Sequence, residues 1–287
     1  MDAISRLICD ELKLRTYTVI SAGILKKLCK IHNTSPTASR ALGGTINAAL
    51  LASALLKPGS AQSVSVKFTG DGALGNVQAQ ADAKGNVRGY VSNPDTDKLA
   101  FSEAIGAGFL SVVRDLNIKE PYTSIMPLVY GSIAADMSYF FTSSEQIPSA
   151  MILALEMNDR EITASGGILI QTFPDTPESS IAFAENSIRN MSKSLGESLL
   201  EGADIVSIVS TLMGNSPLTE TGKTEIQLRC RCSKDMLTET IRGFPKEEIT
   251  QMIEEDHGTE IVCSFCKSVY RFNEDELIKI MNKKSMH

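Results

Sequence analysis

The chain has 287 residues, 43% hydrophobic and 22% charged, which is typical of globular proteins and excludes a wholly disordered chain. Its length allows one sizeable core and a smaller appended unit. The formal net charge of −6 argues against a protein that mainly binds the nucleic-acid backbone, because such binding needs an excess of Lys and Arg. Residues 229–287, with ten Lys and Arg against eleven Asp and Glu, are not a basic arm either.

The N-terminal segment MDAISRLICDELKLRTYTV mixes charged with apolar residues and lacks the layout of a secretory signal. We therefore expect a cytoplasmic protein, in a compartment where thiols are kept reduced. The most apolar run, residues 41–56, is interrupted by Thr45, Asn47 and Ser53 and is too short to read as membrane-spanning. We expect it to lie in a buried helix, and we expect no membrane partner.

Residues 1–175 predict an N-terminal α/β core domain. Segment 39–57 is apolar almost all round and is followed by the helix stop Pro58-Gly59, so it predicts a helix that is covered on both sides. Other segments have the alternation or the short apolar runs of strands, with turn residues between them. They are residues 63–68, 76–81, 86–91, 150–157 and 168–173. The predicted fold class is α+β, with antiparallel sheets packed around the buried apolar helix.

One glycine motif needs a separate interpretation. Residues 70–75, GDGALG, match the G-x-G-x-x-G pattern of dinucleotide-binding loops. The following residues read as a strand, so no helix N-terminus is expected to receive a phosphate. We therefore predict a hairpin turn.

Residues 176–227 predict a helical linker packed on the core. The apolar residues of its first part recur at steps of three, four or seven, as on one face of a helix: Ile181, Ile188, Met191, Leu195 and Leu199. Residues 205–212 predict a second apolar helical face. Glycines between and after these runs are weak points of the linker.

Residues 228–287 predict a small C-terminal domain. Ser233 starts a short helix, and Pro245 leads into a second helix that stops at Gly258. Residues 260–272 read as two short strands around a turn. Asn273-x-x-Glu276 is a capping box that starts a final helix.

Four of the six cysteines form two close pairs in this domain: Cys230 with Cys232, and Cys263 with Cys266. Residues 225–232 alternate like a strand, in which residues two apart point to the same side. The second pair spans the predicted turn. Together the pairs can form a closed site of four cysteine ligands for one Zn²⁺ per chain, which is structural because it leaves no position for a catalytic water.

Several interpretations stay open on spacing alone. The four thiols could form a purely structural zinc site, two disulfides or a redox catalyst, although no βαβ pattern precedes the C-x-x-C motif. No nucleophile and base stand out, so we expect no enzyme and no catalytic residues. A zinc-stabilised adaptor or nucleic-acid-binding module with purely structural cysteines is the alternative function. Cys9 and Cys29 lie in apolar surroundings and are expected to be buried.

The cysteine pairs and several other segments together resemble the 33 kDa heat-shock chaperone family. These segments are RGYVSNP at 88–94, VRDL at 113–116, Pro121-Tyr122 and SEQIPS at 144–149. The resemblance covers nearly the whole chain. Ser132 and Ala135 stand where the resemblance leads us to expect acidic residues, which removes any role for carboxylates at those positions.

The resemblance implies a redox-regulated, ATP-independent holdase that binds unfolding proteins under oxidative and heat stress. It implies that the four cysteines are zinc ligands and redox sensors, and that the reduced, zinc-bound form is inactive. Oxidation would form Cys230–Cys232 and Cys263–Cys266 disulfides, release the zinc and unfold the C-terminal domain and the linker. The implied partners are unfolded or partly unfolded clients, foldase chaperones of the seventy-kilodalton class and a second copy in an active homodimer; no nucleic acid is expected.

Overall fold

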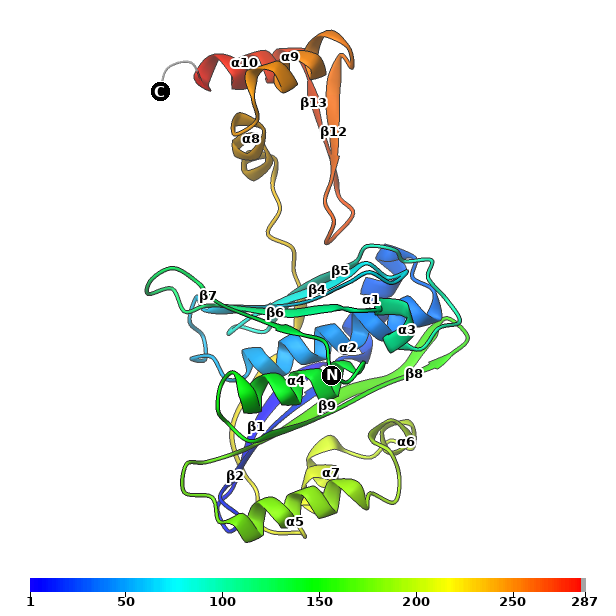
Figure 1. Cartoon of the computed structure of the whole chain (residues 1–287), viewed down its shortest axis with the longest axis vertical. Helices are drawn as coiled ribbons and strands as arrows, with labels where there is room; N and C mark the ends of the chain where they lie inside the picture. The colour runs from blue at the N-terminus through cyan, green and yellow to red at the C-terminus, as the bar shows by residue number, and fades with distance from the viewer. Residues whose placement is uncertain (285–287) are drawn as a thin grey trace. The chain divides into compact units, whose positions relative to one another are not determined.

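The structure is a computed structural model that describes residues 1–284, and it divides into two compact units (Figure 1). The first unit is Met1–Arg229 and the second begins at Cys230. Both mix helices with antiparallel sheets, which confirms the predicted α+β class. Within residues 1–284, no helix combines the length and the apolar character that crossing a bilayer would require.

The first unit contains two sheets. One is five-stranded and antiparallel throughout, in the order β10-β1-β2-β9-β8. Its strands are β1 (Ala3–Cys9), β2 (Leu14–Ile20), β8 (Ser149–Asn158), β9 (Glu161–Thr172) and β10 (Thr219–Glu225). The sequence predicted β8 and β9, whereas β1, β2 and β10 were not predicted.

The other sheet has six strands in the order β11-β5-β4-β3-β6-β7. Its strands are β3 (Ser63–Gly70), β4 (Asn76–Asp82), β5 (Asn86–Val91), β6 (Gly108–Asp115), β7 (Tyr122–Pro127) and β11 (Gln227–Leu228). All pairs are antiparallel except β11 with β5. The G-x-G-x-x-G segment joins β3 to β4, which confirms the predicted hairpin turn.

The predicted apolar helix is α2 (Pro36–Ser53), which lies between the two sheets (Figure 1). Ser35 accepts a hydrogen bond from the Ala38 amide at its start, with proline in the first turn. The helix ends at Ser53, earlier than predicted. The Ser53 hydroxyl bonds back to the Leu50 carbonyl, and the following turns tighten to spacings of three residues. The neighbouring helices are α1 (Ala22–His32), α3 (Phe101–Ile105) and α4 (Ile133–Ser143).

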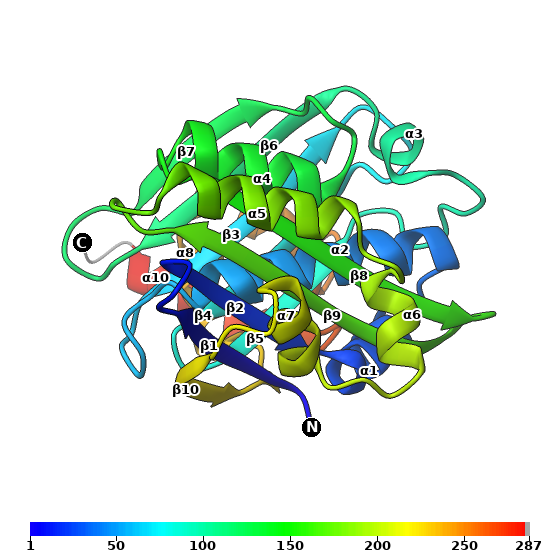
Figure 2. The ribbon, with the colours of Figure 1, turned by 90° about the horizontal axis from the view of Figure 1, so that it is seen from below.

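Three helices cover the opposite face of the five-stranded sheet, as Figure 2 shows. They are α5 (Glu178–Arg189), α6 (Leu195–Leu200) and α7 (Ile205–Leu212), and we call them the connector helices. The stripe predicted over residues 181–199 is split between α5 and α6, because Ser194 starts α6 in a capping box with Glu197. A separate linker domain at 176–227 stays a prediction.

The last residues of the first unit, 219–229, follow the edges of both sheets, and we call them the closing segment. Within it, β10 pairs with β1 and β11 pairs with β5. Between the two strands, the Ile226 amide donates to the Asp2 carbonyl at 3.1 Å. Gly85, at φ +84, allows a close approach here, since a Cβ would lie 2.1 Å from the Glu225 carbonyl oxygen.

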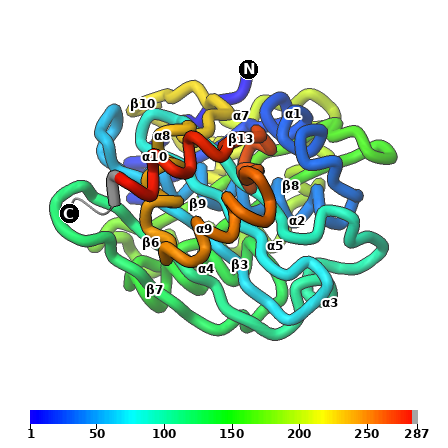
Figure 3. Tube along the Cα trace, turned by 90° about the horizontal axis from the view of Figure 1, so that it is seen from above, coloured from blue at the N-terminus to red at the C-terminus, as the bar shows by residue number. Residues whose placement is uncertain are grey.

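The second unit has its own small core. Its elements are α8 (Lys234–Arg242), α9 (Lys246–Glu254), β12 (Gly258–Val262), β13 (Val269–Asn273) and α10 (Glu274–Lys284), and Figure 3 shows α10 beside α8 and α9. Its buried residues are Ile241, Ile249, Phe272, Leu277 and Ile280. The predicted Asn273–Glu276 capping box is confirmed, with reciprocal hydrogen bonds of 2.9 and 3.1 Å. The predicted strand pair around a turn is β12–β13.

Candidate metal centre

The structure brings the sulfur atoms of all four paired cysteines together: Cys230, Cys232, Cys263 and Cys266 lie within 4.8 Å of one another. Two of the separations join one pair to the other, at 3.7 Å between Cys230 and Cys263 and 3.3 Å between Cys232 and Cys266. All four are free thiols and half-buried. Four convergent sulfurs at this spacing can hold a metal ion.

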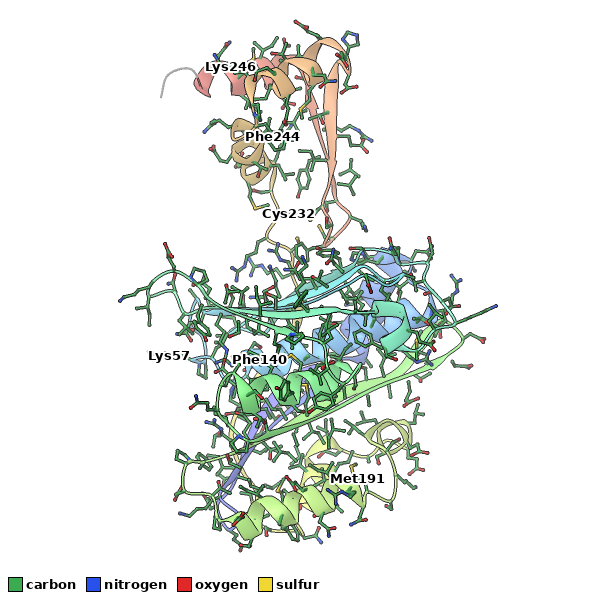
Figure 4. The ribbon with its side chains drawn as sticks, in the orientation of Figure 1. Lys57, Phe140, Met191, Cys232, Phe244 and Lys246 are labelled. Carbon is green, nitrogen blue, oxygen red and sulfur yellow. The ribbon has the colours of Figure 1, made fainter. Side chains whose placement is uncertain are left out.

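Cys230 and Cys232 are not part of a strand, so that part of the prediction was wrong. The last strand before them, β11, ends at Leu228, and residues 229–233 have no regular structure. The alternation of residues 225–232 resembled a strand, but strand β11 ends at Leu228, next to Arg229, whose amide donates to the Val87 carbonyl at 3.0 Å. Figure 4 labels Cys232 in the stretch before α8.

Cys263 and Cys266 lie in the tight turn between β12 and β13, as predicted. Two main-chain bonds of 2.9 Å close this turn: the Cys263 amide donates to the Ser268 carbonyl, and the Lys267 amide donates to the Cys263 carbonyl. Lys267 takes a left-handed conformation, with φ 58. These main-chain bonds hold the turn so that both of its thiols lie at the site.

Tyr270 is a residue of the site that the sequence analysis missed. Its hydroxyl lies 3.2 Å from both the carbonyl oxygen and the sulfur of Cys232, so it can donate to either. Tyr270 and Phe272 are alternate residues of β13, so both point toward the interior of this unit. That alternation was visible in the sequence, but a contact with Cys232 depends on the fold.

A bound cation would change the acid–base properties of the thiols. Burial, with the neighbouring thiols adding to it, raises the pKa of Cys232 to about 12, against the hydrogen bond from Tyr270. Burial also raises the pKa of Cys263. The contact with Cys232 raises the pKa of Tyr270 to about 12. The cluster therefore resists carrying several negative charges by itself, and a metal ion would supply the missing positive charge.

The other two cysteines are outside this site. Cys9 is buried in the core beneath the connector helices and Cys29 in the core around α2. Burial raises the pKa of Cys29, which keeps its thiol protonated and unreactive. Within residues 1–284, the four-cysteine group is the only cluster of metal-ligating side chains found.

Fold and site together define a class of protein: a two-sheet α+β unit followed by a small unit built around four converging thiols. The description "Hsp33 protein" belongs to the family model that matches residues 2–273. A 33 kDa chaperonin from Oceanobacillus iheyensis is 39% identical over 92% of this chain and 94% of its own. Another, from Acetivibrio thermocellus, is 34% identical over 98% of this chain and 97% of its own.

The solved structures give the same answer. The crystal structure of the 33 kDa chaperonin (heat shock protein 33 homolog) from Thermotoga maritima superposes with a TM-score of 0.90 at 28% identity, covering 100% of this chain and 99% of that one. The chain belongs to the Hsp33 family. It is therefore a chaperone, whose partners are unfolded client proteins.

Proposed function

We propose that this chaperone is a redox-regulated, ATP-independent holdase, inactive while reduced and zinc-bound. In our proposal, oxidation forms Cys230–Cys232 and Cys263–Cys266 disulfides, releases the zinc, and unfolds the second unit together with residues 176–227. The observation that carries the proposal is the convergence of two close cysteine pairs on one point in an Hsp33 family member. We place the activity in the cytoplasm, where resting thiols are reduced.

Zinc is the metal that best suits the site. Four thiolates around Zn²⁺ at about 2.3 Å form a tetrahedron in which the sulfurs are about 3.8 Å apart. The observed separations of 3.3 and 3.7 Å between the two pairs are close to that value. The soft thiolate set favours zinc over magnesium or calcium, which prefer oxygen ligands. All four ligand positions are filled by protein, so the metal would act structurally.

The stability of the second unit would depend on the zinc ion that joins the two cysteine pairs. Structural zinc contributes on the order of 10–16 kcal/mol to small domains. The apolar core of this unit has five buried side chains with seven half-buried ones packed against them, which is a small core for a unit of this size. Apart from the sulfurs, the Tyr270 hydroxyl joins Cys232 to the hairpin. Loss of the metal would therefore free the stretch that leads out of the first unit.

Oxidation removes the ligands two at a time. Within each pair, two thiolates give two electrons to hydrogen peroxide and form one S–S bond; the peroxide takes up two protons and leaves as two waters. Disulfides within the pairs close loops across one and two residues, which constrain the chain far less than a metal that joins both pairs. Oxidation would thus replace a metal site that joins two distant cysteine pairs by two local disulfides.

The connector helices conceal the surface that would hold clients. Their apolar faces pack on the five-stranded sheet in a cluster separate from the core around α2. Its sheet-side members include Leu7, Leu14, Ile168 and Ile170, all buried. Release of α5, α6 and α7 would expose this face and the helices' own apolar residues to unfolding proteins. We expect the active form to be a homodimer that passes clients to foldase chaperones of the seventy-kilodalton class.

Zinc content and light scattering test the proposal. The reduced protein should hold one zinc per chain and fail to suppress aggregation of a chemically unfolded enzyme. After peroxide at raised temperature it should lose the zinc, contain the two disulfides by peptide mapping, and suppress aggregation without ATP. An oxidised protein that keeps its zinc and its fold would instead favour a zinc-stabilised adaptor with purely structural cysteines.

A further inference from the structure

Three of the four sheet edges among the described residues of the first unit are protected against pairing with another chain. Strand β10 carries Glu220, Lys223 and Glu225. Strand β8 shifts its register at Glu156 and contacts α4 and α6, and β11 is two residues long. Charges, bulges, covering helices and shortness are the usual means by which proteins prevent edge-to-edge association.

Strand β7 has none of these protections. It forms the free edge of the six-stranded sheet (Figure 1). Its sequence from Tyr122 to Pro127 is YTSIMP, without a charge, and its register with β6 is unbroken. Proline stands only at its last position. An uncharged, regular edge of this kind is a template for another extended chain.

The main-chain groups of β7 that face outward can be assigned from its register. The Leu128 amide donates to the Gly108 carbonyl at 2.9 Å, so residue 128 faces β6. In an antiparallel pair the facing alternates, which directs the main-chain groups of Thr123 and Ile125 to the open side. Both residues are exposed. Two N–H groups and their carbonyls are thus available to an added strand.

The side chains beside this edge are apolar and exposed. Ile125 is 67% exposed and Phe109, its diagonal neighbour on the outer face of β6, is 55% exposed. Tyr122 at the start of the strand is 60% exposed and points to the opposite face of the sheet from Ile125. A partner strand of uncharged, apolar residues would pack against Ile125 on one face and Tyr122 on the other while its main chain pairs with β7.

We propose that the open edge of β7 binds uncharged, extended segments of unfolded client proteins by β-strand addition. The inference rests on the proposed holdase function and names an auxiliary client surface for it. One six-residue edge binds a short segment only weakly, so holding a whole unfolding protein still needs the apolar face that oxidation would uncover beneath the connector helices. Pairing between two copies of β7 would bury only one short strand from each, well below the roughly 1,000 Å² that a stable dimer needs. A small area suits a transient partner, and an unfolded chain has free main-chain groups to offer.

A blocked hexapeptide of alternating threonine and valine is the probe, titrated into the full-length, reduced, zinc-bound protein. Hydrogen exchange by NMR should show the Thr123 and Ile125 amides becoming protected on binding, with the Ser124 amide already protected by β6. The same peptide with N-methyl groups on alternate residues should not bind, because it lacks the donors for strand pairing.

Two variants test the assignment. Ile125→Lys adds the kind of edge charge found on β10, and Thr123→Pro removes one outward N–H without breaking a bond to β6. Each should weaken peptide binding about tenfold or more, which is about 1.4 kcal/mol. Thr219→Lys, the same kind of change on the exposed edge strand β10, is the matched control and should leave binding unchanged. Thermal unfolding should show that all three variants remain folded.

The outcomes separate this inference from the proposed function. Unchanged peptide affinity in both β7 variants, or protection of amides elsewhere, would overturn the β7 site while oxidation-dependent holdase activity could still be found. Protection of Thr123 and Ile125 that grows with protein concentration without peptide would show that the edge pairs with a second copy, and would also overturn it. Peptide pairing at β7 without any oxidation-dependent suppression of aggregation would support this site and contradict the proposed function.

Discussion

A substitution at Thr16 should strengthen the packing of the connector helices on the five-stranded sheet without changing any cysteine. It lies on β2 and is 1% exposed, between its cross-strand neighbours Leu7 and Ile170 in the cluster beneath the connector. Within the described residues its hydroxyl has no hydrogen-bond partner. A buried hydroxyl without a partner costs about 1–3 kcal/mol relative to one in water. Thr16→Val replaces it by a methyl group of the same shape and keeps the β-branched side chain.

We expect Thr16→Val to raise the free energy of unfolding of the first unit by about 1–2 kcal/mol. If connector release exposes this position to water, the same amount is added to the free energy of release, and each 1.4 kcal/mol lowers the open population tenfold. Hydrogen exchange of the α7 amides should therefore slow in the reduced protein. Holdase activity should also appear later after oxidation.

Thr18→Val is the matched control, two residues along the same strand. Thr18 lines a cavity of about 430 Å³ with Ser5 and Leu199, large enough to hold water near its hydroxyl. We expect a smaller gain, or none, because a hydroxyl that faces a cavity with room for water is not left unpaired. A Thr16→Val protein that is no more stable than the wild type in urea, or less so, would show that the Thr16 hydroxyl is satisfied and would refute the reasoning.

Three further changes address the rest of the molecule. Cys232→Ser should abolish stoichiometric zinc binding and most secondary structure of the second unit, whereas Cys29→Ala should keep both; zinc assay and circular dichroism compare them. The ion pair with Lys234 and the capping bond lower the pKa of Glu276. The Glu276 carboxylate therefore stabilises the fold at pH values above the pKa that it has in the unfolded chain, and this stabilisation is lost as pH falls through the lowered pKa. Glu276→Gln should therefore lower the thermal stability at pH 7, and the variant should lose less stability than the wild type between pH 7 and pH 3. Thermal unfolding across this pH range measures both effects. Arg6→Met should destabilise the first unit by about 1–3 kcal/mol in urea, since Arg6 donates to a main-chain carbonyl at the end of α2.

The sequence predicted the features that local pattern determines. The helix between the sheets was evident because an all-apolar helix has no side that water can cover, and the cysteine turn was evident from its spacing. The unpredicted strand β10 depends on a distant partner, because it pairs with β1 only after more than two hundred residues of intervening chain. Strands β1 and β2 form a local hairpin, but β1 is buried at almost every residue and shows no alternation. The break between α5 and α6 was missed, although Ser194-x-x-Glu197 signals a new helix start. Tyr270 in the site could not be inferred, since its contact with Cys232 exists only in the folded unit.

The closing segment has a consequence for how the chain is made. During synthesis β1 emerges before every other strand of this unit, but its outer neighbour β10 and the Ile226–Asp2 bond come last in the unit. Arg6 likewise waits for Thr224, 218 residues later. At about 5–20 residues per second, the β1 edge stays open on the ribosome for on the order of ten to forty seconds. The residues that close the first unit therefore leave the ribosome just ahead of Cys230 and 34 residues ahead of Cys263, so the first unit can be complete before the four-cysteine site can form.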